Sequence, residues 1–177
     1  MQGVQHPNLA NWGKLKRVLQ FSVWGTKYDN KKIETRNLHS LHTYIDASYA
    51  IHDNKRNHNV GLITTGIGIV HGKSSRENLN VKSSTEAEIV GMSDYLPNTL
   101  WTYNFIRAQE YEIRDNVLYQ DNMSAIKMGE NGRLSCTGNS WHIDVRYFFT
   151  KDWVDKKEVR IHYCRTDDMA AGFFTKP

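Results

Sequence analysis

Three acidic residues occupy positions where folding could bring their carboxylates together. Asp46 ends the apolar stretch LHTYID, Asp121 ends VLYQD, and a third acid lies in STEAEIVG as Glu86 or Glu88. Carboxylates are the ligands that Mg²⁺ accepts, and this ion needs few of them from a protein. A pair of such ions can stabilise both the attacking and the leaving oxygen during phosphodiester cleavage. Taken as a set, the acids predict a divalent-metal site with hydrolytic chemistry.

Each acid also has a simpler interpretation when it is considered alone. A carboxylate at the end of a strand can be solvated, and Glu86 lies in the first turn of a predicted helix, where the helix macrodipole favours negative charge. Glu86 and Glu88 are two residues apart, which is about 200° around a helix. They cannot both face one metal pair, so the residues alone leave the choice between them open.

A strand is predicted to carry Asp46 to its position. Successive side chains of a strand point to opposite faces, and this alternation divides residues 41–46 into two sets. Leu41, Thr43 and Ile45 share one face, and His42, Tyr44 and Asp46 share the other. A buried carboxylate on such a strand requires a partner or a metal, because burying an unpaired charge is costly.

The remaining pattern predicts an alternation of strands and helices that is typical of an α/β protein. Helical spacing predicts a helix from residue 83 toward Arg107, bent or broken at Pro97, and further helices over 123–131 and 141–154. Strands are predicted over 31–36, twice within 60–75, over 116–120 and over 158–164, and a last helix begins near Thr166.

Composition indicates one folded domain. The 177 residues are 39% hydrophobic and 24% charged, with only 3 prolines and no uninterrupted apolar run of membrane-spanning length. The net charge of +4 favours an acidic partner such as nucleic acid, although a mildly basic surface explains it equally well. We expect an intracellular protein without a membrane partner or a small-molecule cofactor.

Five motifs in order carry a resemblance to a known family. YIDAS, KSSTEAEIVGMSDYL, LYQDNMSAI, HIDVRYFF and FFTKP resemble the ribonuclease H domain at the C-terminal end of the Pol polyprotein of copia-type retrotransposons. Residues 1–30, with WGKLKRVLQF, resemble the connecting helix after reverse transcriptase, and residues 31–177 resemble the ribonuclease H domain. The chain lacks the Tyr-x-Asp-Asp motif of the polymerase, so we expect it to be a terminal piece of such a polyprotein.

The resemblance implies a fold, a reaction and partners. The fold is ribonuclease H-like: a five-stranded mixed sheet whose first three strands are antiparallel, with helices on both faces. The implied activity is hydrolysis of the RNA strand of an RNA–DNA hybrid with two Mg²⁺ ions, in a cytoplasmic virus-like particle or the nucleus. The remainder of the Pol polyprotein, including reverse transcriptase, is the implied protein partner.

The resemblance also assigns residues to roles. Asp46, Glu88 and Asp121 correspond to catalytic metal ligands, with Glu86 kept in reserve. His142 and Arg146 share a helix face in the family's HID-x-R signature, which suits a contact with phosphate or sugar, or equally a structural hydrogen-bond network.

Two positions depart from the family pattern. Gly172 stands where the family has its fourth metal-binding acid, and Trp141 stands where it usually has Lys or Arg. Asp168 lies four residues before Gly172, so on one helix it would share a face with Gly172 and could replace the missing acid in part. Its simpler role is helix N-terminal charge behind Thr166 as N-cap. The alternative function is therefore a catalytically inactive domain that binds nucleic acid or is a structural remnant of the polyprotein.

Overall fold

The computed structural model describes residues 39–52, 54–65, 68–79, 81–131 and 141–175. These residues belong to one compact unit. The helix predicted within residues 1–30 and the strand predicted over 31–36 lie outside the described residues. Within the described part of the chain, no helix is both long enough and apolar enough to cross a bilayer.

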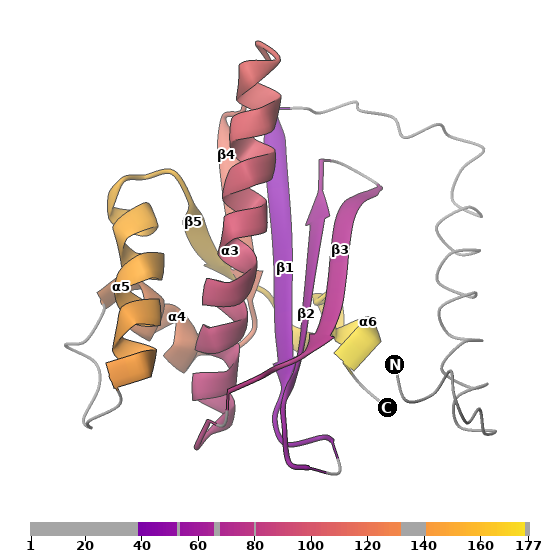
Figure 1. Cartoon of the computed structure of the whole chain (residues 1–177). Coiled ribbons are helices and arrows are strands. Elements are labelled where there is room, and N and C mark those ends of the chain that lie inside the picture. The colour runs from indigo at the N-terminus through magenta and orange to yellow at the C-terminus, as the bar shows by residue number, and fades with distance from the viewer. Residues whose placement is uncertain (1–38, 53, 66–67, 80, 132–140, 176–177) are drawn as a thin grey trace. The chain divides into compact units, whose positions relative to one another are not determined.

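A five-stranded mixed sheet forms the centre of the fold, as the sequence predicted (Figure 1). Its spatial order is β3-β2-β1-β4-β5. The strands are β1 (Ser40–Ser48), β2 (His58–Thr64), β3 (Ile69–Arg76), β4 (Asp115–Gln120) and β5 (Arg160–Tyr163). The first three strands are antiparallel, whereas β4 runs parallel to β1, and β5 runs parallel to β4.

The parallel pairing of β1 with β4 brings Asp46, which lies two residues before the end of β1, and Asp121, which directly follows β4, to the same end of the sheet. Tyr44 of β1 is paired with Tyr119 of β4, so Asp46 and Asp121 each lie two residues beyond a paired position. The carboxyl ends of parallel neighbours face the same way, and side chains at those ends can therefore approach each other. This register explains how residues 75 positions apart come to share one location.

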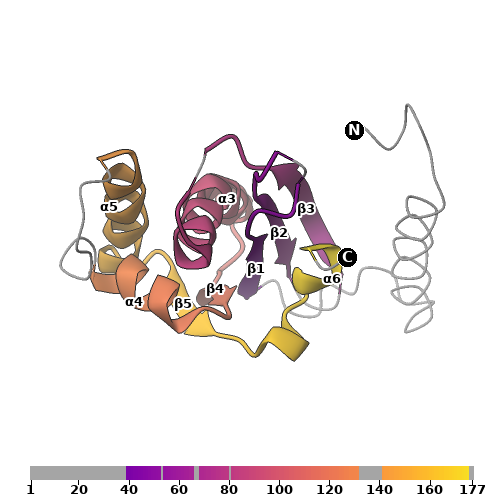
Figure 2. The ribbon, with the colours of Figure 1, turned by 90° about the horizontal axis from the view of Figure 1, so that it is seen from below.

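Three helices cover one face of the sheet (Figure 2). They are α3 (Ser84–Ala108), α4 (Met123–Asn131) and α5 (Trp141–Asp155). Leu41 and Ile45 of β1 are fully buried beneath them, and Thr43 between these two bonds Thr99 of α3 through its hydroxyl at 3.1 Å. The predicted alternation of β1 is therefore confirmed. The core on this face also includes Ile63, Ile89, Met92, Leu96, Leu118, Ala125 and Ile161.

The helix α3 continues through Pro97, so of the bend and the break that were predicted at this residue, the break is wrong. Proline removes one backbone hydrogen bond and crowds the preceding turn, at a cost of about 3 kcal/mol inside a helix. Pro97 is exposed, whereas Leu96, Thr99 and Leu100 around it are buried against the sheet. Burial of these neighbours offsets the local cost and keeps the segment helical.

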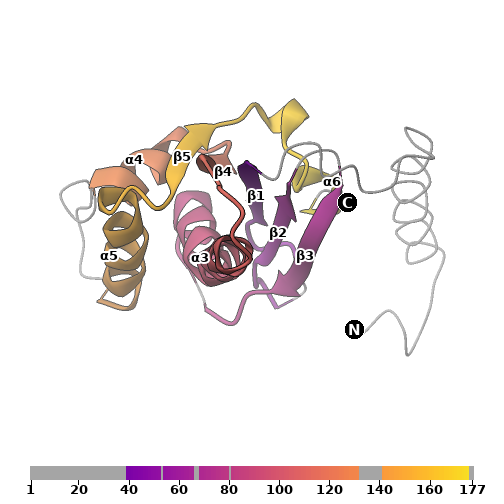
Figure 3. The same ribbon diagram turned by 90° about the horizontal axis from the view of Figure 1, so that it is seen from above.

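The segment after β5 crosses the opposite face of the sheet (Figure 3). It contains a short 3₁₀ helix, η2 (Thr166–Asp168), and one helical turn, α6 (Gly172–Thr175). Between them Met169 is extended, and Met169 and Ala171 are both buried against Val60 and Leu62 of β2. The prediction of one continuous last helix from Thr166 is therefore wrong. The chain is extended at Met169 and then turns, with the backbone N–H of Gly172 donating to the backbone oxygen of Met169 at 3.0 Å.

Candidate active site

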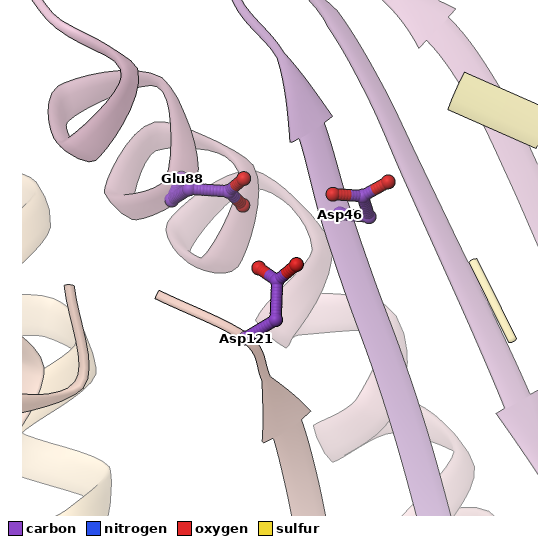
Figure 4. A group of neighbouring side chains, drawn as sticks. All are labelled: Asp46, Glu88 and Asp121. Atoms are coloured by element: carbon purple, nitrogen blue, oxygen red, sulfur yellow. The ribbon is translucent and has the colours of Figure 1, made fainter. Parts of the chain in front are cut away.

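Three carboxylates converge near the carboxyl-terminal ends of the neighbouring strands β1 and β4 (Figure 4). One oxygen from each of Asp46, Glu88 and Asp121 lies within 4.8 Å of the others. Asp46 and Glu88 are buried, and Asp121 is half-buried. The structure thus brings together the three acids that the sequence singled out, from two strand ends and the first turns of α3. Their catalytic and metal-binding roles stay predictions.

Local hydrogen bonds separate the roles of Glu86 and Glu88. The hydroxyl of Ser83, the N-cap of α3, accepts a bond from the backbone N–H of Glu86 at 3.2 Å. The carboxylate of Glu86 reaches back and accepts a bond from the backbone N–H of Lys82 at 2.7 Å. This arrangement is close to a capping box, which satisfies backbone donors at a helix start. Glu86 therefore stabilises the helix end, and Glu88 points to the other acids.

Burial and neighbouring charge perturb Glu88 strongly. Desolvation, followed by the nearby charges of Asp46 and Asp121, raises the pKa of its carboxyl from the ordinary value of 4.5 to about 9. Hydrogen bonds from Gln120 and from the backbone of Ala47 lower it, but by less. At neutral pH and without a cation, the Glu88 carboxyl holds a proton. A divalent ion in this position would supply the positive charge that favours the ionised form.

Gln120 connects the acids and was missed by the sequence reasoning. Its side chain is completely buried, and its amide nitrogen donates to a carboxylate oxygen of Glu88 at 3.1 Å. Its amide oxygen accepts bonds from the backbone N–H groups of Asp121 at 2.7 Å and Asn122 at 3.0 Å. Gln120 thus fixes the start of the loop that carries Asp121. The available signal in the sequence was a glutamine between the apolar residues of a predicted strand and the acid that follows it.

Two threonines that were not identified as site residues also contact the acids. The hydroxyl of Thr166 donates to Oδ2 of Asp121 at 2.9 Å. The hydroxyl of Thr175 donates to Oδ2 of Asp46. Thr166 begins η2, where it was expected to be the N-cap of a helix, but Arg165 holds that position. No local pattern in the sequence indicates these long-range contacts.

The two predicted nucleic-acid-binding residues, His142 and Arg146, both lie on α5. His142 belongs to this helix, but its side chain is outside the described part of the structure. The guanidinium of Arg146 forms an ion pair with the carboxylate of Asp94 on α3. The side chain of Arg146 is 23% exposed, so one of its faces remains open to solvent. This contact fits the structural interpretation of Arg146 and leaves its nucleic-acid contact a prediction.

Position 172 lies close to the acidic site. The Thr175 hydroxyl that donates to Asp46 is also 3.3 Å from the backbone oxygen of Gly172. Asp168 is exposed and belongs to η2, whereas Gly172 begins α6. The expectation that these two residues share one helix face, one turn apart, is therefore wrong.

The acidic site fits a hard divalent cation such as Mg²⁺. The three acids offer only oxygen ligands, which hard cations prefer. Mg²⁺ is usually held by one or two carboxylates together with water and substrate phosphates. The spacing of the three acids and the raised pKa of Glu88 are those of a cluster with excess negative charge. Asp46, Glu88 and Asp121 together could hold such an ion.

No family model matches the chain. The chain is 25% identical over 174 residues to the retrovirus-related Pol polyprotein from transposon TNT 1-94 of Nicotiana tabacum. It is 27% identical over 178 residues to that from transposon RE2 of Arabidopsis thaliana. These matches cover 98% and 99% of this chain, but only 13% and 12% of the relatives. The chain therefore spans about an eighth of the length of the relatives.

Solved structures of ribonucleases H are also similar to the chain. Ribonuclease H1 from Halobacterium salinarum NRC-1 has a TM-score of 0.49 and 12% identity, over 75% of this chain and 90% of that chain. LC11 ribonuclease H1 in complex with an RNA/DNA hybrid has a TM-score of 0.49 and 12% identity, over 74% and 89%. The chain is thus similar over nearly its whole length to a segment of retrotransposon Pol polyproteins, and its sheet is the five-stranded mixed sheet that the motifs predicted.

Proposed function

We propose that this chain is a ribonuclease H domain of a retrotransposon Pol polyprotein. It binds an RNA–DNA hybrid and hydrolyses the RNA strand with two Mg²⁺ ions held by Asp46, Glu88 and Asp121. The observation that carries the proposal is the convergence of these three carboxylates within 4.8 Å. Further support comes from relatives that are Pol polyproteins and align with nearly the whole chain.

The residues of the site have separate tasks in this proposal. A pair of Mg²⁺ ions, when bound, lowers the pKa of the attacking water and stabilises the attacking and leaving oxygens. Asp46 and Asp121 offer carboxylate oxygens from neighbouring strand ends, which are rigid supports. Glu88 holds a proton at its carboxyl without a cation and releases it when it becomes a ligand. Gln120 orients Glu88 and the backbone at Asp121.

The proposed substrate follows from the kind of relatives and from charge. Pol polyproteins of retrotransposons include reverse transcriptase, whose product is an RNA–DNA hybrid. A net charge of +4 suits binding to a nucleic-acid backbone. The remainder of the polyprotein, with its reverse transcriptase, is the proposed covalent partner, because this chain corresponds to only 12–13% of the relatives.

A catalytically inactive domain is the second candidate function, and Gly172 is the observation that favours it. Position 172 lies beside the site through Thr175, yet it offers no side-chain ligand. A site with three acids in place of four would hold the second ion more weakly. In this version the domain still folds and binds nucleic acid but does not cleave it.

Cleavage of a hybrid with a labelled RNA strand tests the proposal. We expect RNA cleavage that requires Mg²⁺ or Mn²⁺ and is abolished in the Asp46→Asn and Asp121→Asn variants. Duplex DNA of the same sequence should remain intact. Folded wild-type protein that binds the hybrid but leaves its RNA strand intact at every metal concentration would establish the inactive alternative.

A further inference from the structure

The segment that follows β5 passes from one strand-end acid to the other. We call residues 164–175 the C-terminal strap. At its start the backbone N–H of Cys164 donates to the backbone oxygen of Gln120 at 2.9 Å, which holds the strap beside the end of β4. In its middle Met169 and Ala171 are buried against β2. At its end the hydroxyl of Ser48 donates to the backbone oxygen of Thr175 at 3.1 Å, beside the end of β1.

The strap presents one hydroxyl to each of the two strand-end carboxylates. Thr166 donates to Asp121 at 2.9 Å, and Thr175 donates to Asp46, 129 residues earlier in the chain. Thr175 is only 4% exposed and Asp46 only 9%, so water does not compete freely for this second bond. A hydrogen bond to an ionised acceptor is about twice as strong as one between neutral groups. The two bonds therefore restrict how each carboxylate turns.

The Asp46 carboxylate presents one of its oxygens to the other two acids. Figure 4 shows one oxygen of its carboxylate pointing toward Glu88 and Asp121, and the other oxygen pointing away from them. The Thr175 hydroxyl donates to Oδ2 of this carboxylate and so limits how the carboxylate rotates. Residues that hydrogen-bond metal ligands orient them and raise their affinity for the metal, and loss of such a residue typically weakens metal binding about 10- to 100-fold.

We propose that Thr175 and Thr166 are positioning residues that hold the carboxylates of Asp46 and Asp121 in the orientation required for a divalent cation. This inference rests on the proposed metal site and extends it to the strap. The strap has no acid at position 172, so in this chain it supports the site through hydroxyl groups. Neither threonine is a metal ligand in this arrangement, because each acts through the acid that it contacts.

Titration with Mn²⁺, followed by isothermal calorimetry on the full chain, tests the role of the hydroxyl groups. Thr175→Val keeps the side-chain shape and removes the donor, and we expect Mn²⁺ affinity to fall about tenfold or more. Thr175→Ser keeps the donor and should restore affinity close to the wild-type value. Thr150→Val is the matched control, because Thr150 is also buried but donates to the backbone oxygen of Arg146 at 3.1 Å.

Thr166→Val provides an independent arm, because Thr166 is exposed and its substitution should not impair folding. We expect a weaker affinity for Mn²⁺ in this variant too, by several-fold. Wild-type affinity in Thr166→Val and in folded Thr175→Val would overturn the positioning role while leaving the proposed function intact. If Thr175→Val does not fold, the result with Thr166→Val decides. No binding of Mn²⁺ by the wild-type chain would overturn the proposed function and this inference together.

Discussion

The side-chain amide of Gln120 donates a hydrogen bond to the carboxylate of Glu88 at 3.1 Å, and this bond links the end of β4 to the first turns of α3. The oxygen of the same amide accepts two backbone N–H groups at the start of the following loop. The side chain of Gln120 is completely buried. Gln120 therefore connects the position of Glu88 to the backbone geometry of Asp121.

Replacement of Gln120 by Met should destabilise the protein. Methionine has a similar shape but accepts no strong hydrogen bond, so two backbone donors and one carboxylate oxygen lose a partner. An unsatisfied buried polar group costs about 1–3 kcal/mol. We expect a decrease of about 2 kcal/mol or more in the free energy of unfolding, measured by urea denaturation. A decrease below about 0.5 kcal/mol would show that water replaces these bonds and that Gln120 does not fix the loop.

The stability of the metal-free protein should depend on pH through Glu88. The folded-state pKa is about 9, above the ordinary value of 4.5 that applies to the unfolded chain. Between these two pH values Glu88 binds more protons in the folded state, so its contribution to stability is greatest below about pH 4.5 and is lost as the pH rises toward 9. Each unit of pKa difference corresponds to about 1.4 kcal/mol.

The Glu88→Gln variant isolates this contribution, because its amide does not titrate. We expect the variant to gain stability relative to the wild type as the pH rises from 5 to 9, with no metal present. Added Mg²⁺ should reverse the trend for the wild type only, since the ionised carboxylate is its ligand. A stability difference between the two proteins that stays constant across this pH range would contradict the perturbed titration of Glu88.

Close approach of β2 to α3 predicts a sharp difference between two glycines. A Cβ atom at Gly61 would lie 2.2–2.4 Å from the ring of Tyr95, whereas one at Gly68 would meet nothing within 4 Å. The Tyr95 ring is held by its hydroxyl, 2.7 Å from Nδ1 of His71. Gly61→Ala should therefore lower stability by about 1–3 kcal/mol, as overpacking does, and Gly68→Ala should change it little. Equal thermal unfolding temperatures for the two variants would mean that Tyr95 moves freely.

The sequence predicted the convergence of the three acids because much of it depends on local patterns. Strand alternation and strand ends placed Asp46 and Asp121, and the motif resemblance selected Glu88. The capping pattern from Ser83 to Glu86 was also readable, since the serine three residues before an acid indicates a helix start. These features depend on neighbours within a few residues, so they can be recognised in the sequence and are found in the folded protein.

The strap was predicted less well because it depends on distant contacts. Local pattern alone suggested one helix from Thr166, but Met169 is extended and, with Ala171, is buried against β2, which interrupts the helix. The hydrogen bond from Thr175 to Asp46 joins residues 129 positions apart, and neither residue type indicates the other. The predicted break at Pro97 is absent from α3 for a related reason, since packing on the sheet outweighs local preference.

Arg146 should contribute to hybrid binding if it contacts a phosphate. The Arg146→Gln variant should weaken binding and reduce the slope of log affinity against log salt by about 1. Arg107→Gln is a suitable control, because Arg107 is an exposed helix arginine, also near one carboxylate, Glu158 at 4.0 Å. Both changes should alter stability by less than about 1 kcal/mol. Identical salt slopes for the two variants would assign Arg146 to the ion pair with Asp94 alone.

Restoration of the missing acid should strengthen the site. The Thr175 hydroxyl contacts both the carboxylate of Asp46 and the backbone oxygen of Gly172, so position 172 lies close to the site. We expect an aspartate at this position to offer a fourth carboxylate. A fourth acid would help to hold the second ion near the leaving oxygen. We expect Gly172→Asp to raise the rate of Mg²⁺-dependent cleavage and to lower the Mg²⁺ concentration that gives half the maximal rate.

The experiment compares cleavage of one labelled hybrid by the wild type, Gly172→Asp and Gly68→Asp across a Mg²⁺ titration. Gly68→Asp adds the same charge at a position with open space around the new side chain, so it should behave as the wild type does. Asp168→Asn in the wild-type background tests the partial replacement. Because Asp168 is exposed and lies outside the helix of Gly172, we expect at most a small effect. A folded, hybrid-binding Gly172→Asp protein that cleaves no faster than Gly68→Asp would mean that position 172 does not correspond to the fourth acid.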